Sequence, residues 1–235
     1  MNRSVVTASV FALIALIILC GLGAWQLERL AWKQKLIADL NARVGATPEA
    51  LPAAPEQERD EFRRVRVRVQ FAQGGQALVY TAGSALRPDV QGAGYWVMAP
   101  AKGERGTVVV NRGYVAPEAR GNIAAPPSGD VEIVGALRWP EEGGAFTPPD
   151  EPSNNVWFRR DPSAIASAKS WGPVAPFYIE QESPQLAGAP KAGPLVVKLT
   201  NNHLQYAITW FGLAGALACV FLVWLRGRLR RVTPR

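Results

Sequence analysis

Histidine and cysteine are nearly absent from this chain of 235 residues, which contains one histidine, His203, and two cysteines, Cys20 and Cys219. All three lie in long uncharged stretches near the two ends, so the middle of the chain has neither residue type. The middle therefore cannot supply a Ser-His or Cys-His nucleophile pair, or the histidine and cysteine ligands of a zinc hydrolase. We accordingly do not expect an enzyme.

The two cysteines are also poorly placed for a disulfide. If the two end segments run as antiparallel helices, their depths differ by about 13 Å at 1.5 Å per residue. Two Cα atoms joined by a disulfide lie within about 7 Å of each other. The sequence also lacks a Cys-x-x-Cys-His segment for covalent haem attachment and a Cys/Met-rich copper site. The cysteines are therefore expected to be free.

Acidic residues are absent from both ends, because all 19 lie between Glu28 and Glu182. Six of the 26 basic residues lie outside residues 28–198, so twenty bases face nineteen acids in the middle. The net charge of +7 thus belongs to the ends, where it flanks apolar sequence. This distribution indicates contact with anionic membrane lipid, and we expect no nucleic-acid partner.

Two apolar runs are long enough to cross a bilayer, which takes roughly 20 helical residues. Residues 4–27 carry no charge, and residues 199–225 contain no Asp, Glu, Lys or Arg. The first run exceeds the 7–15-residue core typical of a cleaved signal peptide, and Leu19 occupies the position where a lipoprotein signal needs a small residue. We predict transmembrane helices at 5–27 and 203–225.

The C-terminal tail determines the expected orientation. Residues 226–235 contain five arginines and no acid, which favours the cytoplasmic side. Two crossings then place the 1–4 tail there as well, and residues 28–198 outside, although Arg29, Lys33 and Lys35 follow the first span on the translocated side. No Arg/Ser-rich transit segment is present. We therefore expect a multi-pass protein of a bacterial plasma membrane with an extracytoplasmic main domain.

The main domain is expected to be rich in short β-strands. Helical spacing continues from the first span to Gly45, and a linker rich in proline, alanine and glutamate follows at 47–61. Alternating polarity predicts strands at 64–71 and 77–82, joined as a hairpin, and further strands at 95–99, 107–110, 131–139 and 176–180. Residues 140–155 read as a surface loop, and 163–170 as a short helix capped by Asp161. The fold class is therefore a membrane-anchored α+β protein, in which two transmembrane helices flank an antiparallel sandwich or barrel-like domain.

One face of strand 64–71 carries a row of arginines, Arg64, Arg66 and Arg68, opposite a row of valines. Such a row is most often a solvated face. It could also meet an acidic partner or lipid headgroups.

The candidate site lies at the mouth of the second apolar run. His203 falls in its first turn, where a neutral imidazole can ligate iron beside a flat apolar macrocycle. Tyr206 and Trp210 share its helical face, and Trp25 and Arg29 lie at the exit of the first run. The alternative is ordinary membrane chemistry, with an interfacial histidine, belt aromatics, a snorkelling arginine and a helix-packing seam. Gly212 and Ala216 add a small-xxx-small pair that would admit a neighbouring helix.

Several motifs in one order resemble the Surfeit locus 1 family of cytochrome oxidase assembly proteins. They are Gly23-x-Trp25-Gln26-x-x-Arg29-x-x-Trp32-Lys33, Phe62-Arg63-Arg64-Val65, Val110-Asn111-Arg112-Gly113-Tyr114-Val115 with Pro117, Trp157-x-x-Arg160-Asp161, and Asn202-His203-Leu204-Gln205-Tyr206-Ala207-x-Thr209-Trp210.

The resemblance implies an assembly factor, or chaperone, for a haem-copper terminal oxidase. It further implies transient binding of haem a, with His203 as the iron ligand. Around that ligand we expect Tyr206 and Trp210 to flank the ring, and Trp25 and Arg29 to close its rim. The implied partners are the oxidase catalytic subunit, haem A synthase and membrane lipid. The alternative is a scaffold that holds the nascent catalytic subunit without binding haem.

Overall fold

The computed structural model of the chain describes residues 3–73 and 75–230. They divide into two compact units, a helical one formed from Met1–Ala38 with Leu199–Arg235, and a sheet unit formed from Asp39–Lys198. The 1–4 and 226–235 tails lie partly outside the described residues.

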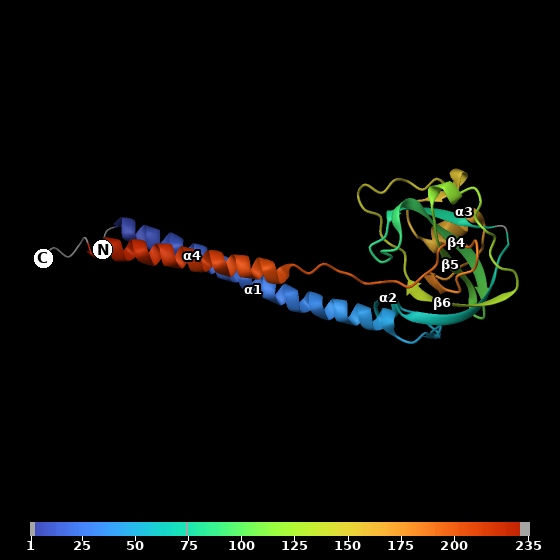
Figure 1. Cartoon of the computed structure of the whole chain (residues 1–235), viewed down its shortest axis with the longest axis horizontal. Helices are drawn as coiled ribbons and strands as arrows, with labels where there is room; N and C mark the ends of the chain where they lie inside the picture. Colours follow the sequence, from blue (N-terminus) through green and yellow to red (C-terminus); the bar gives the residue numbers. More distant parts are fainter. Residues whose placement is uncertain (1–2, 74, 231–235) are drawn as a thin grey trace. The chain divides into compact units, whose positions relative to one another are not determined.

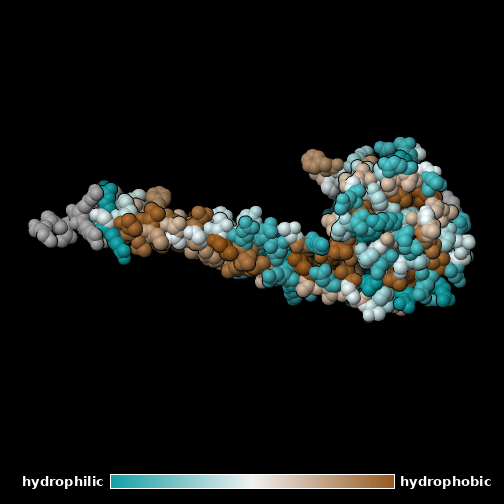
Figure 2. Space-filling model, in the orientation of Figure 1, coloured by the Kyte–Doolittle hydropathy of each residue, from teal (hydrophilic) through white to brown (hydrophobic). Residues whose placement is uncertain are grey.

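Two helices form the helical unit. They are α4 (His203–Arg230), of 28 residues, and most of α1 (Arg3–Gly45), one continuous helix of 43 residues whose last part, from Asp39, belongs to the sheet unit. The predicted continuation of the first helix to Gly45 is therefore confirmed. Both helices are long and apolar enough to cross a membrane, over Val5–Gly45 and His203–Arg228. Figure 2 shows hydrophobic surface along both, with exposed side chains such as Phe11, Ile17 and Val220. The spans 5–27 and 203–225 lie within them and stay predictions.

Small residues let the two helices approach each other. Gly23 on α1 is buried, and a Cβ added there would lie 2.7–2.9 Å from three ring carbons of Phe211 on α4. On the same face of α4, Ala207 and Ala214 are 1% and 5% exposed. A Cβ added at Gly212, in contrast, would meet no atom within 4 Å. The predicted small-residue pair at Gly212 therefore does not form the contact between α1 and α4.

The sheet unit is one sheet of eight strands with the order β1-β2-β6-β8-β5-β4-β3-β7 and an additional β2–β4 pairing. Its strands are β1 (Glu49–Ala50), β2 (Arg64–Phe71), β3 (Ala77–Gly83), β4 (Gln91–Gly103), β5 (Gly106–Val115), β6 (Asp130–Arg138), β7 (Val156–Trp157) and β8 (Tyr178–Ser183). The pairings β2–β6–β8–β5–β4–β2 therefore close into a circuit (Figure 1).

The expectation of a purely antiparallel architecture is wrong. Three pairings are parallel, β1–β2, β3–β7 and β5–β8. Parallel neighbours need a long connection, and the chain between β5 and β8 provides one, through η1 (Pro117–Ala119), β6, η2 (Pro152–Asn154), β7 and α3 (Pro162–Lys169). All eight strands belong to the same sheet, so the described residues do not form the two sheets of a sandwich.

The predicted hairpin between 64–71 and 77–82 is also wrong, although both strands exist. β4 is 13 residues long and pairs with β3 over its first part and with β2 at its end. Phe71 faces Ala101, and Ala77 faces Met98, so β2 and β3 follow one another along β4. Pairing of both strands with β4 thus replaces the predicted pairing of β2 with β3.

The core follows the alternation that predicted the strands. Val65 and Val69 of β2 are 0% and 2% exposed and pack with Ile133, Leu137 and Ile179. The 47–61 linker is more ordered than expected, since it contains β1 and α2 (Gln57–Asp60). The N-cap of α3 is confirmed, because an Asp161 carboxylate oxygen accepts hydrogen bonds from the backbone N–H groups of Ser163 and Ala164.

Candidate functional site

His203 is the first residue of α4 and is partly buried within the helical unit. Its Nδ1 lies 2.7 Å from Oε1 of Gln26 on α1. Because an amide carbonyl oxygen only accepts hydrogen bonds, this contact favours the neutral tautomer that carries its proton on Nδ1. The lone pair of the neutral ring then lies on Nε2, which makes no hydrogen bond within the described part of the chain. His203 thus presents one nitrogen that can bind a metal.

The other predicted site residues lie on the same two helices but do not contact His203 through any described hydrogen bond or ring contact. Tyr206 and Trp25 are 54% and 52% exposed, and Trp210 is partly buried. The Arg29 guanidinium stacks 4.0 Å over the Trp32 ring. These side chains leave aromatic ring surface exposed in the middle of α1 and in the first turns of α4.

Gln26 is the residue that sequence reasoning missed. It is the one carboxamide in the apolar run 4–27. A carboxamide in a membrane helix needs a hydrogen-bond partner, and this requirement marks Gln26 as a residue with a polar neighbour without identifying that neighbour.

The described residues contain no group of three or more His, Cys, Asp or Glu side chains that could hold a metal ion. Cys20 and Cys219 are free, as expected, and exposed. A metal at His203 would therefore have fewer than three such ligands from the described residues. A haem iron fits such a site, because its macrocycle supplies the equatorial ligands and the protein needs to supply only an axial one.

In the sheet unit, Arg138 and Arg160 form a buried ion network. Arg138 donates to Glu61 at 2.7 Å and to Glu141 at 2.8 Å, and Arg160 donates to Glu180 at 3.3 Å and also to Glu141. Glu141 thereby anchors the start of the 140–155 loop. The Glu141 carboxylate is therefore held in a fixed position.

The same is true of Asp150, which accepts a hydrogen bond from the backbone N–H of Phe158 and pairs with Arg159. Within the network, Tyr178 is fully buried. Burial raises the pKa of its hydroxyl well above the usual range, against the opposing effect of Arg160 and Arg138. The network joins two arginines to three glutamates and thereby supports the start of the loop.

Asn111 and Arg112 of the Asn-Arg-Gly-Tyr motif are also structural. Both are buried, at 0% and 4% exposure. The Asn111 side chain accepts from the Gly113 N–H at 3.1 Å, and Arg112 donates to the backbone oxygens of Ala124 and Ala125. Burial lowers the pKa of Arg112 to about 10. Gly113 lies within β5 and has φ +124, a backbone conformation that glycine adopts readily.

The three arginines in the row on β2 differ in their exposure and in their ion pairs. Arg64 makes a two-pronged ion pair with Glu182, at 2.9 and 2.6 Å. Arg66 lies 3.9 Å from Glu132, and both Arg66 and Arg68 are exposed. The prediction of a solvated face therefore holds for Arg66 and Arg68 but not for Arg64.

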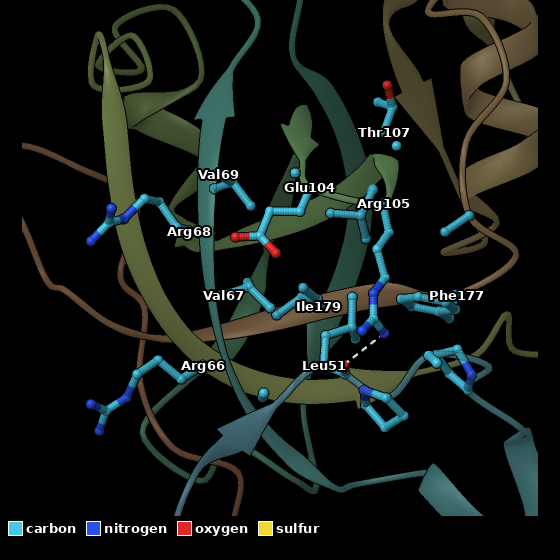
Figure 3. Close-up of a pocket in the computed structure, with 18 of the residues that line it drawn as sticks. Leu51, Arg66, Val67, Arg68, Val69, Glu104, Arg105, Thr107, Phe177 and Ile179 are labelled. Carbon is cyan, nitrogen blue, oxygen red and sulfur yellow. Dashed lines mark hydrogen bonds between the residues drawn. The ribbon is translucent and has the colours of Figure 1, made fainter.

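A cavity of about 420 Å³ lies beside this strand. Figure 3 shows Val67, Phe177 and Ile179 lining it, while the Arg66 and Arg68 guanidinium groups point away. Arg105 reaches across and donates to the Leu51 carbonyl at 2.9 Å.

Comparisons with known proteins place this geometry in context. A model described as the SURF1 family matches residues 13–215. The chain is 35% identical over 233 residues to Surfeit locus protein 1 of Rattus norvegicus, covering 91% of this chain and 73% of that protein. It is 34% identical over 228 residues to the Homo sapiens protein of the same name (88% and 74%). It is also 33% identical over 232 residues to a SURF1-like protein of Drosophila melanogaster (90% and 74%).

Proposed function

The chain belongs to the SURF1 family, and from that premise we propose that it is an assembly factor for a haem-copper terminal oxidase that holds haem a through His203. The supporting observation is the sole imidazole of the chain, held at the start of α4 by its Nδ1 contact with Gln26, while Nε2 has no hydrogen-bond partner among the described residues. We place the protein in a bacterial plasma membrane, with residues 28–198 outside the cytoplasm.

The residues of the chain have distinct roles in this proposal. His203 would hold the iron through Nε2, and the exposed rings of Tyr206 and Trp25, with Trp210, would contact the apolar macrocycle. Arg29, whose guanidinium lies over the Trp32 ring, would pair with an anionic propionate. The iron of haem a supplies the coordination bond and the redox chemistry that the oxidase uses.

One protein ligand suits a carrier rather than a resident site. Transfer requires that the carrier bind haem a less tightly than the oxidase catalytic subunit does. Coordination through one histidine, beside side chains as exposed as Tyr206 and Trp25, would meet this requirement. Haem A synthase is the proposed donor and the catalytic subunit the proposed acceptor.

The direct test uses His203→Ala, with Gln205→Ala as a matched control on the same exposed turn of α4. Both full-length variants are purified from a host that makes haem A, and haem content and spectrum are measured. We expect the His203→Ala protein to lose its bound haem a and the Gln205→Ala protein to keep it. An unchanged spectrum and stoichiometry in His203→Ala would remove the ligand assignment.

A scaffold that holds the catalytic subunit without haem remains the second candidate. The observation that favours it is the exposure of Arg66 and Arg68 on one strand face. If the protein is a scaffold, replacing Arg66 and Arg68 by Gln should lower oxidase activity in cells, and His203→Ala should leave that activity unchanged. The carrier proposal expects the reverse.

A further inference from the structure

The hydrogen bond between His203 and Gln26 joins the only imidazole of the chain to the opposite helix. We propose that Gln26 is the positioning residue of the haem site, which fixes His203 as the Nδ1–H tautomer and directs Nε2 to the iron. This inference rests on the proposed function, because it concerns the same histidine.

The tautomer follows from the chemistry of the contact. A neutral imidazole in water favours the proton on Nε2, which would leave Nδ1, beside the backbone, as the only lone pair. The Gln26 carbonyl oxygen at 2.7 Å requires a proton on Nδ1 and reverses this preference. Histidines that bind metals commonly donate the other ring N–H to a carbonyl or carboxylate in this way.

The packing of the helices holds Gln26 in place. Gly23 lies three residues before Gln26 and is in close contact with the Phe211 ring, and Ala207 lies one turn after His203 and is 1% exposed. The two backbones are thus close on the side from which the Gln26 side chain reaches His203. A contact supported by packed backbones orients a ligand better than a free surface side chain does.

A carboxamide also suits a carrier in a membrane. It adds no charge within the apolar run. Its oxygen is a weaker acceptor than a carboxylate, so it increases the donor strength of the imidazole less. Gln26 therefore orients His203 without making the iron bond too strong for transfer.

The tautomer can be measured without haem, because the chain has one histidine. The full-length protein, labelled with ¹⁵N-histidine and held in detergent micelles, gives one set of ring nitrogens in a ¹⁵N–¹H multiple-bond spectrum. We expect the Nδ1–H pattern in the wild type and in a Gln34→Met control on an exposed position of α1. Gln26→Met, similar in shape but without the acceptor oxygen, should shift toward the Nε2–H pattern. An identical pattern in Gln26→Met would overturn the proposal.

Titration with haem a separates this inference from the proposed function. Gln26→Met should weaken binding by about 10- to 100-fold, the usual effect of removing such a hydrogen-bond partner. Gln26→Glu should retain or strengthen binding. Unchanged affinity in Gln26→Met would refute the positioning role and leave His203 as ligand. If His203→Ala binds haem a as the wild type does, the proposed function itself fails, whatever tautomer is found.

Discussion

At the residue scale, the Asp161 side chain closes the first turn of α3. Its carboxylate accepts from two backbone N–H groups, and α3 has only eight residues. Asp161→Ala leaves those donors without their acceptor and should cost about 1 kcal/mol of unfolding free energy. Asp161→Asn should restore most of it. Urea unfolding of the full-length protein in detergent, followed by tryptophan fluorescence, measures both, and equal stability of all three proteins would contradict the capping role.

Asp60 gives a pH dependence. Burial alone would raise the pKa of this carboxyl, but hydrogen bonds from Arg59, the Glu56 backbone N–H and Arg63 lower it from 3.8 to about 2. A carboxyl whose folded pKa is depressed stabilises the fold fully above its unfolded pKa. This stabilisation is therefore complete above about pH 4 and is lost as pH falls toward 2. Stability measured across pH 2–5 should have a flatter profile in Asp60→Asn than in the wild type.

Glu180 carries the most deeply buried negative charge of the ion network, at 2% exposure. Glu180→Gln leaves Arg160 and Arg138 with less compensating charge in a desolvated site, and should cost about 3 kcal/mol. Glu132→Gln is the control, because its side chain is 55% exposed and lies 3.9 Å from Arg66. That change should cost less than about 1 kcal/mol. Equal effects of the two substitutions in urea unfolding would show that the network contributes no more than a surface pair.

The sequence identified some single residues and missed others for a physical reason. His203 stands out because it is the only histidine and lies at the mouth of an apolar run. Gln26 could be connected to it only by knowing how the two helices rotate against each other. That rotation depends on Gly23 accepting the Phe211 ring, a contact between residues almost 190 positions apart.

At the element scale, Gly135 allows β6 and β8 to approach. A Cβ there would clash with the Glu180 carbonyl oxygen and lie 2.7 Å from the Ile179 side chain. Backbone cannot move aside as a flexible side chain can, so Gly135→Ala should destabilise the protein by about 2 kcal/mol. Gly121→Ala is the control, since its added Cβ meets no atom within 4 Å. Matching urea midpoints for the two variants would refute the tight β6–β8 contact.

Strand positions were largely predictable, but strand partners were not. The alternation over 64–71 gives β2 with its observed bounds, because each valine must be buried and each arginine must reach solvent or an acid. The partner of β2 is decided by long-range packing. Because β4 is long enough to pair with both β2 and β3, these two strands do not pair with each other as a hairpin. The parallel β5–β8 pairing likewise depends on α3 and the loops before it, which local periodicity does not describe.

At the scale of the whole molecule, the predicted topology places the sheet unit outside the cytoplasm. Phe146 is 98% exposed, so a cysteine there is open to reagents. In a variant with Cys20→Ser and Cys219→Ser, Phe146→Cys should react with a membrane-impermeant maleimide added to spheroplasts. Labelling only after lysis would show that the sheet unit lies in the cytoplasm. It would contradict the predicted orientation and the position of His203 at the outer leaflet.

The central claim is that the iron of haem a is bound by His203. Pulsed EPR of the ferric haem a complex, with the protein carrying ¹⁵N only in histidine, tests it directly because one residue supplies every ¹⁵N nucleus. We predict ¹⁵N hyperfine coupling to the iron in the wild type and none in His203→Ala. Bound haem a without ¹⁵N coupling in the wild type would contradict the account.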